Sequence, residues 1–358
     1  MNSSLSLQIR VMRMKNSLPL VLSMLLLLGG RVASAEEDQV FVKRGASVKG
    51  QLGQVSPIQI SINTGGVNRT INTNEIRLVN FSDEPMELRE GRARAVGGKY
   101  ESAISDLKSV EPNGIGREIV KQDWQFYWAL CQGRVALSSG GDKAKATELM
   151  LAFVRSAADS FHFFEAAELL GDLAVSQGDY GNAVKYYGAI ASKAPWPAYQ
   201  MRASLSEAKA MVQQGEFADA QKQFESVVAQ KSDTPEVKRQ KLLAEVGRGR
   251  CLAETASPDE GIATIEKLIL ENDPADTEIF GRAYNALGDC LQVAGKPNDA
   301  LMAYLHVDVL FYADPDTHAE SLYHLSKLWL VAKNQDRAAA AKNLLKQRYA
   351  GSVWSGKP

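Results

Sequence analysis

The side chains in this sequence best suited to metal binding or nucleophilic catalysis are four histidines and three cysteines. They are His162, His306, His318, His324, Cys131, Cys251 and Cys290. No two histidines form an HxxxH or HExxH pair, and no histidine lies at ligand spacing from a cysteine, so the sequence predicts no metal site. The cysteines are odd in number and none belongs to a CxxC pair, which predicts small buried apolar residues rather than a disulfide framework.

Other catalytic signatures are also missing from the sequence. It contains no GxSxG nucleophile motif and no P-loop, and its acidic residues are scattered in a way typical of solvated helix faces. We therefore expect a protein that is not an enzyme and has no cofactor. The part of the chain after residue 35 carries 37 bases against 42 acids. Because a nucleic-acid-binding protein would usually carry a basic excess, no nucleic acid is expected as a partner.

Small residues recur at fixed spacing and indicate the elements of the chain. Four stretches share a ten-residue pattern with Gly first and Ala sixth: GKYESAISDL, GDYGNAVKYY, GEFADAQKQF and GKPNDALMAY. Another small residue lies seven positions before each leading Gly. The complete set is Gly91, Gly98, Ala103, Gly171, Gly178, Ala183, Ala208, Gly215, Ala220, Gly288, Gly295 and Ala300. Apolar residues follow helical spacing on both sides of the leading Gly, so each unit is predicted to be two helices joined by a tight turn.

Close packing explains why these positions hold small residues. Where two antiparallel helices cross tightly, a side chain larger than Ala would push the backbones apart, and Gly171 and Ala183 are predicted to mark such a crossing. The Gly of the turn is expected to end the first helix, because Gly adopts a positive φ at little cost.

This spacing resembles the tetratricopeptide repeat, which has small residues at its eighth and twentieth positions and an aromatic residue near the seventeenth. With Phe164 as the first position, Gly171, Tyr180 and Ala183 fall on that pattern. The resemblance covers residues 84–350, with intervals of 37, 41 and 39 between later units, which exceed the usual repeat of about 34 residues. It implies a mainly α fold, in which a right-handed α-solenoid of about seven helix hairpins occupies residues 84–358.

The resemblance also implies where a partner would bind. In this family the second, fifth, ninth and twelfth positions of each repeat usually line a concave face that holds extended peptides or partner helices. The charged and amide residues at those positions are Glu165, Glu168, Asp172, Arg202, Lys209, Arg282, Asn285, Asp289 and Gln292. They predict a groove of mixed charge.

Residues 36–83 differ from the repeats and are predicted to form a small five-stranded, β-barrel-like domain. Runs rich in Val, Ile and Thr lie around 39–43, 46–53, 57–63, 67–71 and 76–81. Alternation in PIQISIN places Ile58, Ile60 and Ile62 on one face, and Ser82 or Asp83 is expected to cap the first helix. The domain resembles an SH3-like or Sm-like barrel. Sm-like barrels often bind RNA, but a structural role at the end of the solenoid is favoured here because basic residues are not in excess.

Residues 1–35 resemble an export signal. A positive start at Met14 to Asn16 precedes an apolar run over 18–28, and Ala33 and Ala35 are the small residues before a cleavage point. The run is shorter than the roughly 20 residues that a spanning helix needs. We therefore expect cleavage rather than an uncleaved anchor, no membrane span in the mature chain, and a periplasmic, cell-envelope-associated or secreted protein. Initiation at the first methionine or at Met14 is left open.

Together these features predict a non-enzymatic protein–protein interaction scaffold of the bacterial cell envelope, with a partner protein or peptide bound on the concave face. The alternative is a module that binds envelope glycan or cell-wall material through the β domain and the aromatic clusters DWQFYW and SFHFF. Packing between helix pairs is the competing interpretation of those clusters. The sequence specifies neither the partner nor the oligomeric state.

Overall fold

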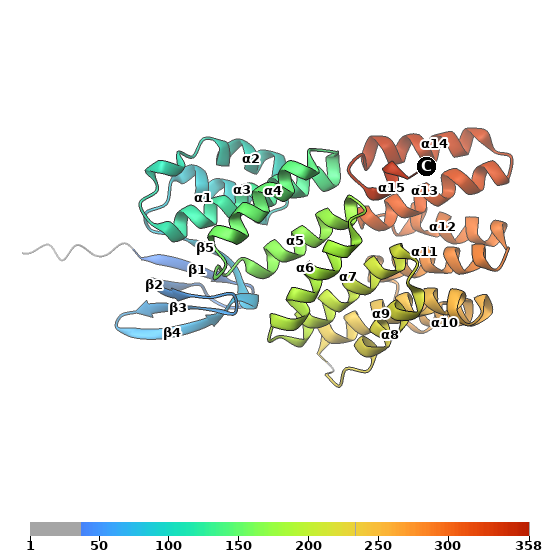
Figure 1. Ribbon diagram of the computed structural model, residues 1–358, viewed down its shortest axis with the longest axis horizontal. Coiled ribbons are helices and arrows are strands. Elements are labelled where there is room, and N and C mark those ends of the chain that lie inside the picture. Colours follow the sequence, from blue (N-terminus) through green and yellow to red (C-terminus); the bar gives the residue numbers. More distant parts are fainter. Residues whose placement is uncertain (1–36, 233, 358) are drawn as a thin grey trace, which may run out of the picture. The chain divides into compact units, whose positions relative to one another are not determined.

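The computed structural model describes residues 37–232 and 234–357. Within these residues five β-strands come first and 15 α-helices follow, which confirms the predicted mainly α architecture (Figure 1). Within these residues, no helix is long and apolar enough to span a membrane. The predicted export signal lies outside the described residues.

The strands form one antiparallel sheet with the order β4-β3-β2-β1-β5. They are β1 (Asp38–Val42), β2 (Val48–Val55), β3 (Gln59–Thr64), β4 (Val67–Asn72) and β5 (Ile76–Asn80). Val40 pairs with Val79 and Ile60 with Ile71, and all four side chains are buried. Ile58 precedes β3 and is 40% exposed, so the prediction that it shares the buried face of Ile60 and Ile62 is wrong.

The helices pair in chain order into seven hairpins. These are α1 (Met86–Val96) with α2 (Tyr100–Lys108), α3 (Glu118–Ser139) with α4 (Lys143–Ser156), α5 (Phe163–Ser176) with α6 (Tyr180–Lys193), α7 (Pro197–Gln214) with α8 (Phe217–Val228), α9 (Pro235–Thr255) with α10 (Pro258–Glu271), α11 (Thr277–Val293) with α12 (Pro297–Leu310), and α13 (Pro315–Val331) with α14 (Gln335–Arg348). The short helix α15 (Val353–Gly356) follows, and 3-10 turns lie at Thr73–Glu75 and Pro112–Gly114.

The small residues of the repeat perform two different tasks. Gly98, Gly178, Gly215 and Gly295 end first helices with φ between 71° and 80°, and an added Cβ there would touch nothing within 4 Å. These four glycines are therefore needed for backbone conformation and not for space.

The small residues inside the helices are needed for space. An added Cβ at Gly171 would lie 2.4 Å from the ring of Tyr187, and one at Gly288 would lie 2.6 Å from the ring of Tyr304. At Gly91 it would lie 2.7 Å from the side chain of Leu107. The alanines of the pattern are fully buried: Ala103, Ala183, Ala208, Ala220 and Ala300.

One unit has Gly261 where the others have Ala, and the packing explains the difference. A Cβ at Gly261 would lie 2.7 Å from the carbonyl oxygen of Gly249, which is closer than atoms can approach. Helices α9 and α10 therefore cross more tightly than an alanine would permit.

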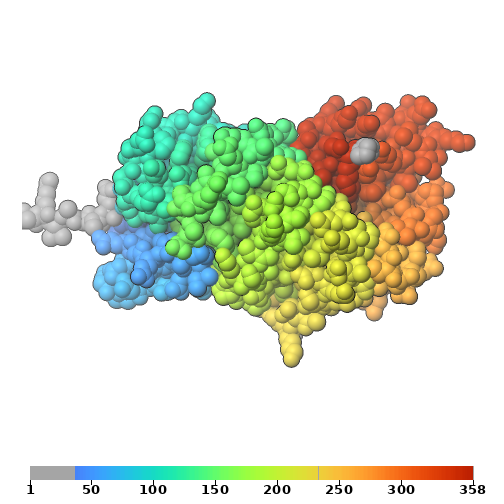
Figure 2. Space-filling view, viewed as in Figure 1, coloured from blue at the N-terminus to red at the C-terminus, as the bar shows by residue number. Residues whose placement is uncertain are grey.

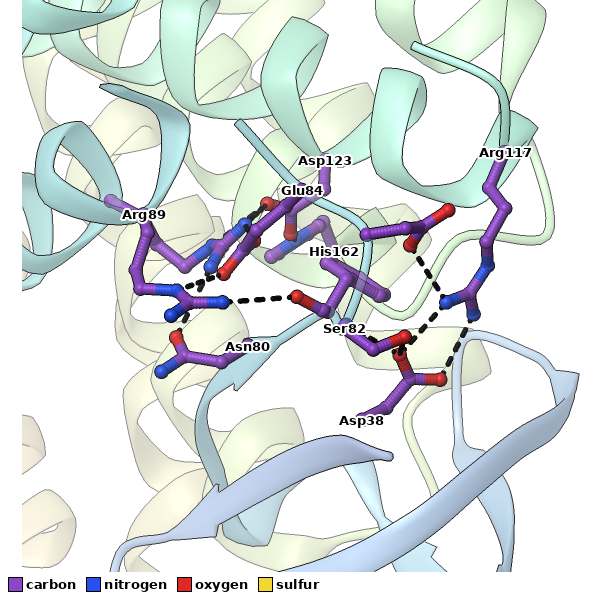
Figure 3. Close-up of polar contacts among 11 residues, drawn as sticks. Asp38, Asn80, Ser82, Glu84, Arg89, Arg117, Asp123 and His162 are labelled. Carbon is purple, nitrogen blue, oxygen red and sulfur yellow. Dashed lines mark hydrogen bonds and ion pairs between the residues drawn. The ribbon is translucent and has the colours of Figure 1, made fainter. Parts of the chain in front are cut away.

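A polar network ties the sheet to the first helices (Figure 3). Asp38 of β1 accepts hydrogen bonds from both terminal nitrogens of Arg117, at 2.8 and 2.9 Å, and from the backbone N–H of Ser82 at 3.0 Å. Arg117 also donates to Asp83 at 3.0 Å. The N-cap of α1 is Pro85, and no side chain caps this helix. The expectation that Ser82 or Asp83 caps α1 is therefore wrong, because both residues join the network instead.

The inner part of this network is buried. The guanidinium of Arg92 is fully buried, and its Nε donates to Asp123 at 2.8 Å while a terminal nitrogen pairs with Glu84. The other oxygen of Asp123 lies 2.9 Å from Nε2 of His162 (Figure 3). Each buried charge thus has a partner, which burial requires.

The last described segment contacts the second hairpin. The backbone N–H of Gly351 donates to the carbonyl of Ser138 at 3.3 Å. An added Cβ at Gly351 would lie 2.5 Å from the carbonyl oxygens of Ala136 and Leu137. Figure 2 shows the red surface of the last helices directly against the green surface of earlier ones. The residues that follow the seventh hairpin therefore contact the second hairpin.

Candidate functional site

The ninth position of successive repeats carries charge. It holds Arg134 in α3, Asp172 in α5, Lys209 in α7, Arg250 in α9 and Asp289 in α11. A terminal nitrogen of Arg134 lies 2.9 Å from the carboxylate of Asp172, and Arg250 pairs in the same way with Asp289. Neighbouring first helices are thus joined by opposite charges at equivalent positions.

Both aspartates belong to a repeated local arrangement. The hydroxyl of Tyr187 donates to Asp172 at 2.9 Å, and that of Tyr304 donates to Asp289 at 2.6 Å. In both units a glycine precedes the aspartate and the tyrosine ring lies over it. The small residue therefore allows the second helix to supply a hydrogen-bond donor to the charge on the first.

Lys209 faces helices that are distant in sequence. It is partly accessible to solvent, yet burial lowers its pKa to about 8, and the nearby positive charge of Arg282 on α11 adds to this effect. Asp314 and Asp316 at the start of α13 act in the opposite direction. Among the described residues it forms no ion pair. Charges on α7, α11 and α13 therefore act on one another in this region, which we call the recess.

The other predicted basic residues are engaged in pairs. Arg202 on α7 lies 3.0 Å from Glu168 on α5, and its guanidinium also covers the ring of Tyr199. Arg282 pairs with Glu278 at 3.1 Å and with Asp314 at 3.5 Å. These side chains remain partly accessible, so they line the face as paired charges.

The predicted acidic and amide residues differ in accessibility. Glu165 is exposed, whereas Asn285 and Asp289 are only 2% and 8% exposed. Asn285 donates to the carbonyl of Thr317 at 2.8 Å, and Gln292 donates to the hydroxyl of Tyr304 at 2.7 Å. Asn285 and Asp289 thus bond to neighbouring helices from beneath the surface, whereas Gln292 is half-buried. Contact between any of the nine residues and a partner stays a prediction.

Sequence reasoning missed two carboxylates in the recess. Asp316 and Glu320 on α13 form no ion pair with any described residue, although Glu320 accepts a hydrogen bond from Asn285 at 3.0 Å. Burial raises the pKa of Glu320 to about 7, and the nearby carboxylates of Asp289 and Asp316 raise it further in the same direction. Arg250 and Arg282 act on the Glu320 pKa in the opposite direction.

The β domain also reaches this face. The charge of Lys43, in the loop between β1 and β2, acts on Arg202, Glu165 and Glu168. Arg44 of the same loop lies 3.1 Å from Glu236 at the start of α9, in an exposed pair. The β1–β2 loop thus borders the first helices of the third to fifth hairpins.

The two aromatic clusters lie mainly in the core. Phe126 stacks on His162 with ring centroids 3.7 Å apart, and Phe164 packs edge-on against Trp196 at 5.8 Å. Phe126, Tyr127 and Phe164 are all less than 5% exposed. The cysteines are likewise buried. The packing interpretation therefore accounts for the clusters. In the described part of the chain, no group of His, Cys, Asp and Glu could hold a metal ion.

Two comparisons with known proteins agree on the repeat. A family model described as a tetratricopeptide repeat-like domain matches residues 155–307. Among solved structures, a tetratricopeptide repeat protein from Parabacteroides merdae is similar with a TM-score of 0.52 and 16% identity, covering 74% of this chain and 92% of that one. This likeness concerns the fold alone. No curated protein matches the sequence.

Two further solved structures are similar at lower scores. The quorum sensor NprR from B. thuringiensis has a TM-score of 0.46 and 8% identity, covering 73% of this chain and 85% of that one. RapI has a TM-score of 0.45 and 10% identity, covering 73% and 75%.

A signal for the missed pairs was present in the sequence. Two pairs of adjacent repeats carry opposite charges at the ninth position, so Arg134 opposite Asp172 and Arg250 opposite Asp289 could have been inferred from the repeat register. The recess around Asp316 and Glu320 had no such signal, because it brings together hairpins that are not neighbours in the array.

Proposed function

We propose that this protein is a non-enzymatic protein-interaction scaffold of the bacterial cell envelope, and that a partner binds on the face formed by the first helices. The observation that carries the proposal is the recess between α7, α11 and α13. Among the described residues it holds a half-buried cation without an ion pair, Lys209, a half-buried carboxylate without one, Glu320, and an exposed carboxylate without one, Asp316.

Incomplete pairing of recessed charges favours ligand binding. A charge removed from water without a partner costs free energy, so a ligand that supplies the opposite charge recovers it. Several other charges along the first helices are paired across neighbouring repeats, as Arg134 is with Asp172 and Arg202 with Glu168, which fixes their positions before a partner arrives. A preorganised face of this kind binds with less loss of conformational freedom.

Both signs of charge in the recess indicate the chemistry of the partner. Lys209 suits an acidic side chain, whereas Asp316 and Glu320 suit a basic one. A segment that carries both signs would satisfy both ends of the recess, which agrees with the mixed-charge groove expected from sequence.

Site-specific photocrosslinking in the native cells tests this proposal. A photoreactive residue replaces Lys209 on the proposed face in one strain and Lys267, exposed on α10, in the control strain. We expect mass spectrometry to identify a specific crosslinked protein at position 209 and not at position 267. Equal crosslinking at both positions, or none at 209, contradicts the proposed face.

Charge reversal gives a second measurement of the same face. Lys209→Glu should weaken capture of the crosslinked partner about tenfold, because it places a third carboxylate beside Asp314 and Asp316. Lys267→Glu serves as the matched control and should leave capture unchanged. Circular dichroism of both variants establishes that they remain folded.

The envelope location is a separate part of the proposal. It is supported by the export signal expected over residues 1–35. Fusing the first 40 or so residues to a reporter enzyme that is active only after export tests it. An inactive reporter retained in the cytoplasm would remove the envelope role while leaving the scaffold role intact.

A further inference from the structure

The segment from Ser352 to Lys357 folds back over the first helices. Its helix α15 contacts α13, and Trp354 is only 6% exposed. The indole ring lies 5.5 Å from the ring of Tyr323 and 5.6 Å from that of His324, measured between centroids. Trp354 therefore anchors the segment on α13, the helix that also carries Asp316 and Glu320.

Lys357 extends from this anchor toward a distant hairpin. Its ammonium group lies 3.8 Å from the centre of the Trp354 ring, and Nζ donates to Gln213 in the last turn of α7 at 3.0 Å. Gln213 is four residues beyond Lys209 on the same helix. The segment thus spans the recess between α13 and α7, at one end of the proposed face.

The charge of Lys357 fits the surroundings. Burial lowers its pKa, while the nearby carboxylates of Glu320, Asp289 and Asp316 act to raise it. Arg250 is the nearby positive group. The chain therefore places one of its own cations beside the carboxylates that lack an ion pair.

We propose that segment 352–357 is an internal occupant of the concave face, and that the partner displaces it with a segment of the same chemistry: an aromatic side chain followed three residues later by a lysine. The inference rests on the proposed function and names the partner chemistry for the same recess.

Few polar contacts hold the segment beyond its packing against the core. Val353 and Trp354 pack against the main hydrophobic core, the hydroxyl of Ser355 donates to the carbonyls of Tyr349 at 2.6 Å and Leu345 at 3.3 Å, and Lys357 donates to Gln213. Gly351, immediately before it, stays attached to Ser138. Release therefore requires only movement of the residues after Gly351, and the hairpins keep their places.

Binding of the segment in trans tests the inference. The probe is a fluorescent peptide with the native sequence of residues 350–357, AGSVWSGK. Its anisotropy is titrated with full-length wild type and with the full-length double variant Trp354→Ala/Lys357→Ala. Because the native segment fills the site in the wild type, we expect about tenfold tighter peptide binding to the variant.

Two further variants distinguish release of the native segment from loss of the fold. Lys346→Ala removes an exposed cation from α14 and should leave peptide affinity at the wild-type value. Lys357→Glu leaves Trp354 in place and should also tighten peptide binding. It keeps the test informative if the double variant unfolds. A peptide carrying both alanine substitutions should bind none of the proteins.

Equal peptide affinity in the wild type and in the folded variants overturns the inference, and would mean that the segment is a permanent end of the array. This result is independent of the photocrosslinking at position 209. A partner crosslinked there without peptide binding retains the scaffold and removes the internal occupant. Peptide binding without any crosslinked partner retains the internal occupant and removes the proposed partner face.

Discussion

The hydroxyl of Tyr304 reaches the carboxylate of Asp289 at 2.6 Å because Gly288, next to the aspartate, leaves room for the tyrosine ring. The same relationship joins Tyr187 to Asp172 in the third hairpin. The small residues of the repeat therefore do more than bring two helices together. They allow a tyrosine from the second helix to fix the charge that the first helix presents.

Loss of the Tyr304 hydroxyl should weaken the fold. Tyr304→Phe keeps the ring but leaves the buried carboxylate of Asp289 without its phenolic donor, and a hydrogen bond to a charged group contributes about 1.5–3 kcal/mol. We expect a loss of that size in urea unfolding. Tyr312→Phe alters a tyrosine that is 49% exposed, and should change stability by less than about 0.5 kcal/mol. Equal effects of both substitutions would show that the hydroxyl is unimportant.

Two glycine substitutions with the same chemistry should act in opposite directions. Gly288→Ala places a methyl group 2.6 Å from the Tyr304 ring, and such overpacking costs about 1–3 kcal/mol. Gly188→Ala adds the same methyl group to α6, where nothing lies within 4 Å, and should stabilise the helix by about 0.5–1 kcal/mol. Thermal unfolding of both variants measures the difference. A stabilising Gly288→Ala would refute the tight crossing.

The buried network beside the sheet should be sensitive to removal of one partner. Arg92→Leu leaves Glu84 and Asp123 buried without their cation, which costs about 3–5 kcal/mol. Arg94→Gln, two residues away, removes an arginine whose side chain is 43% exposed, so it should cost less than about 1 kcal/mol. Urea midpoints of the two variants test this ordering, and comparable midpoints would contradict it.

Glu320 should make stability depend on pH. Its pKa is raised from 4.5 to about 7, by burial first and then by Asp289 and Asp316, while Arg250, Arg282 and Lys357 oppose the rise. The folded protein therefore binds the proton more tightly than the unfolded chain. The resulting stability is fully present below about pH 4.5 and is lost as pH rises through about 7.

The variant Glu320→Gln cannot titrate at this position and should lack that part of the pH dependence. The difference in melting temperature between wild type and variant, measured at several pH values between about 4.5 and 8, should therefore move against the wild type as pH rises. Glu266→Gln changes an exposed carboxylate on α10 and is the matched control. Parallel curves for wild type and Glu320→Gln would exclude the raised pKa.

Much of the fold could be predicted from the sequence because its signals are local. The Gly and Ala spacing reports contacts within a hairpin, and the structure has seven hairpins as expected. All five strands lie within two residues of their predicted positions. The prediction for Ile58 was wrong because alternation indicates a face but not where a strand starts. Strand β3 begins one residue after Ile58.

The site was less predictable because it depends on hairpins far apart in the chain. The repeat register selected Lys209, which is half-buried, and also Asn285, which is 2% exposed. Asp316, Glu320 and Lys357 meet there only because the array brings α13 and the last segment opposite α7. No spacing rule within one repeat carries that information.

The hydrogen bond between Gly351 and Ser138 affects how the protein unfolds. An open chain of repeats frays from its outermost units, since each of these has a single neighbour. Here Gly351, just after the last hairpin, is hydrogen-bonded to Ser138 in the second hairpin. Fraying at that end must therefore first break this contact. Hydrogen exchange in α13 and α14 should accordingly be as slow as in the middle of the array, and a bulky residue at position 351 should turn a concerted melt into a stepwise one.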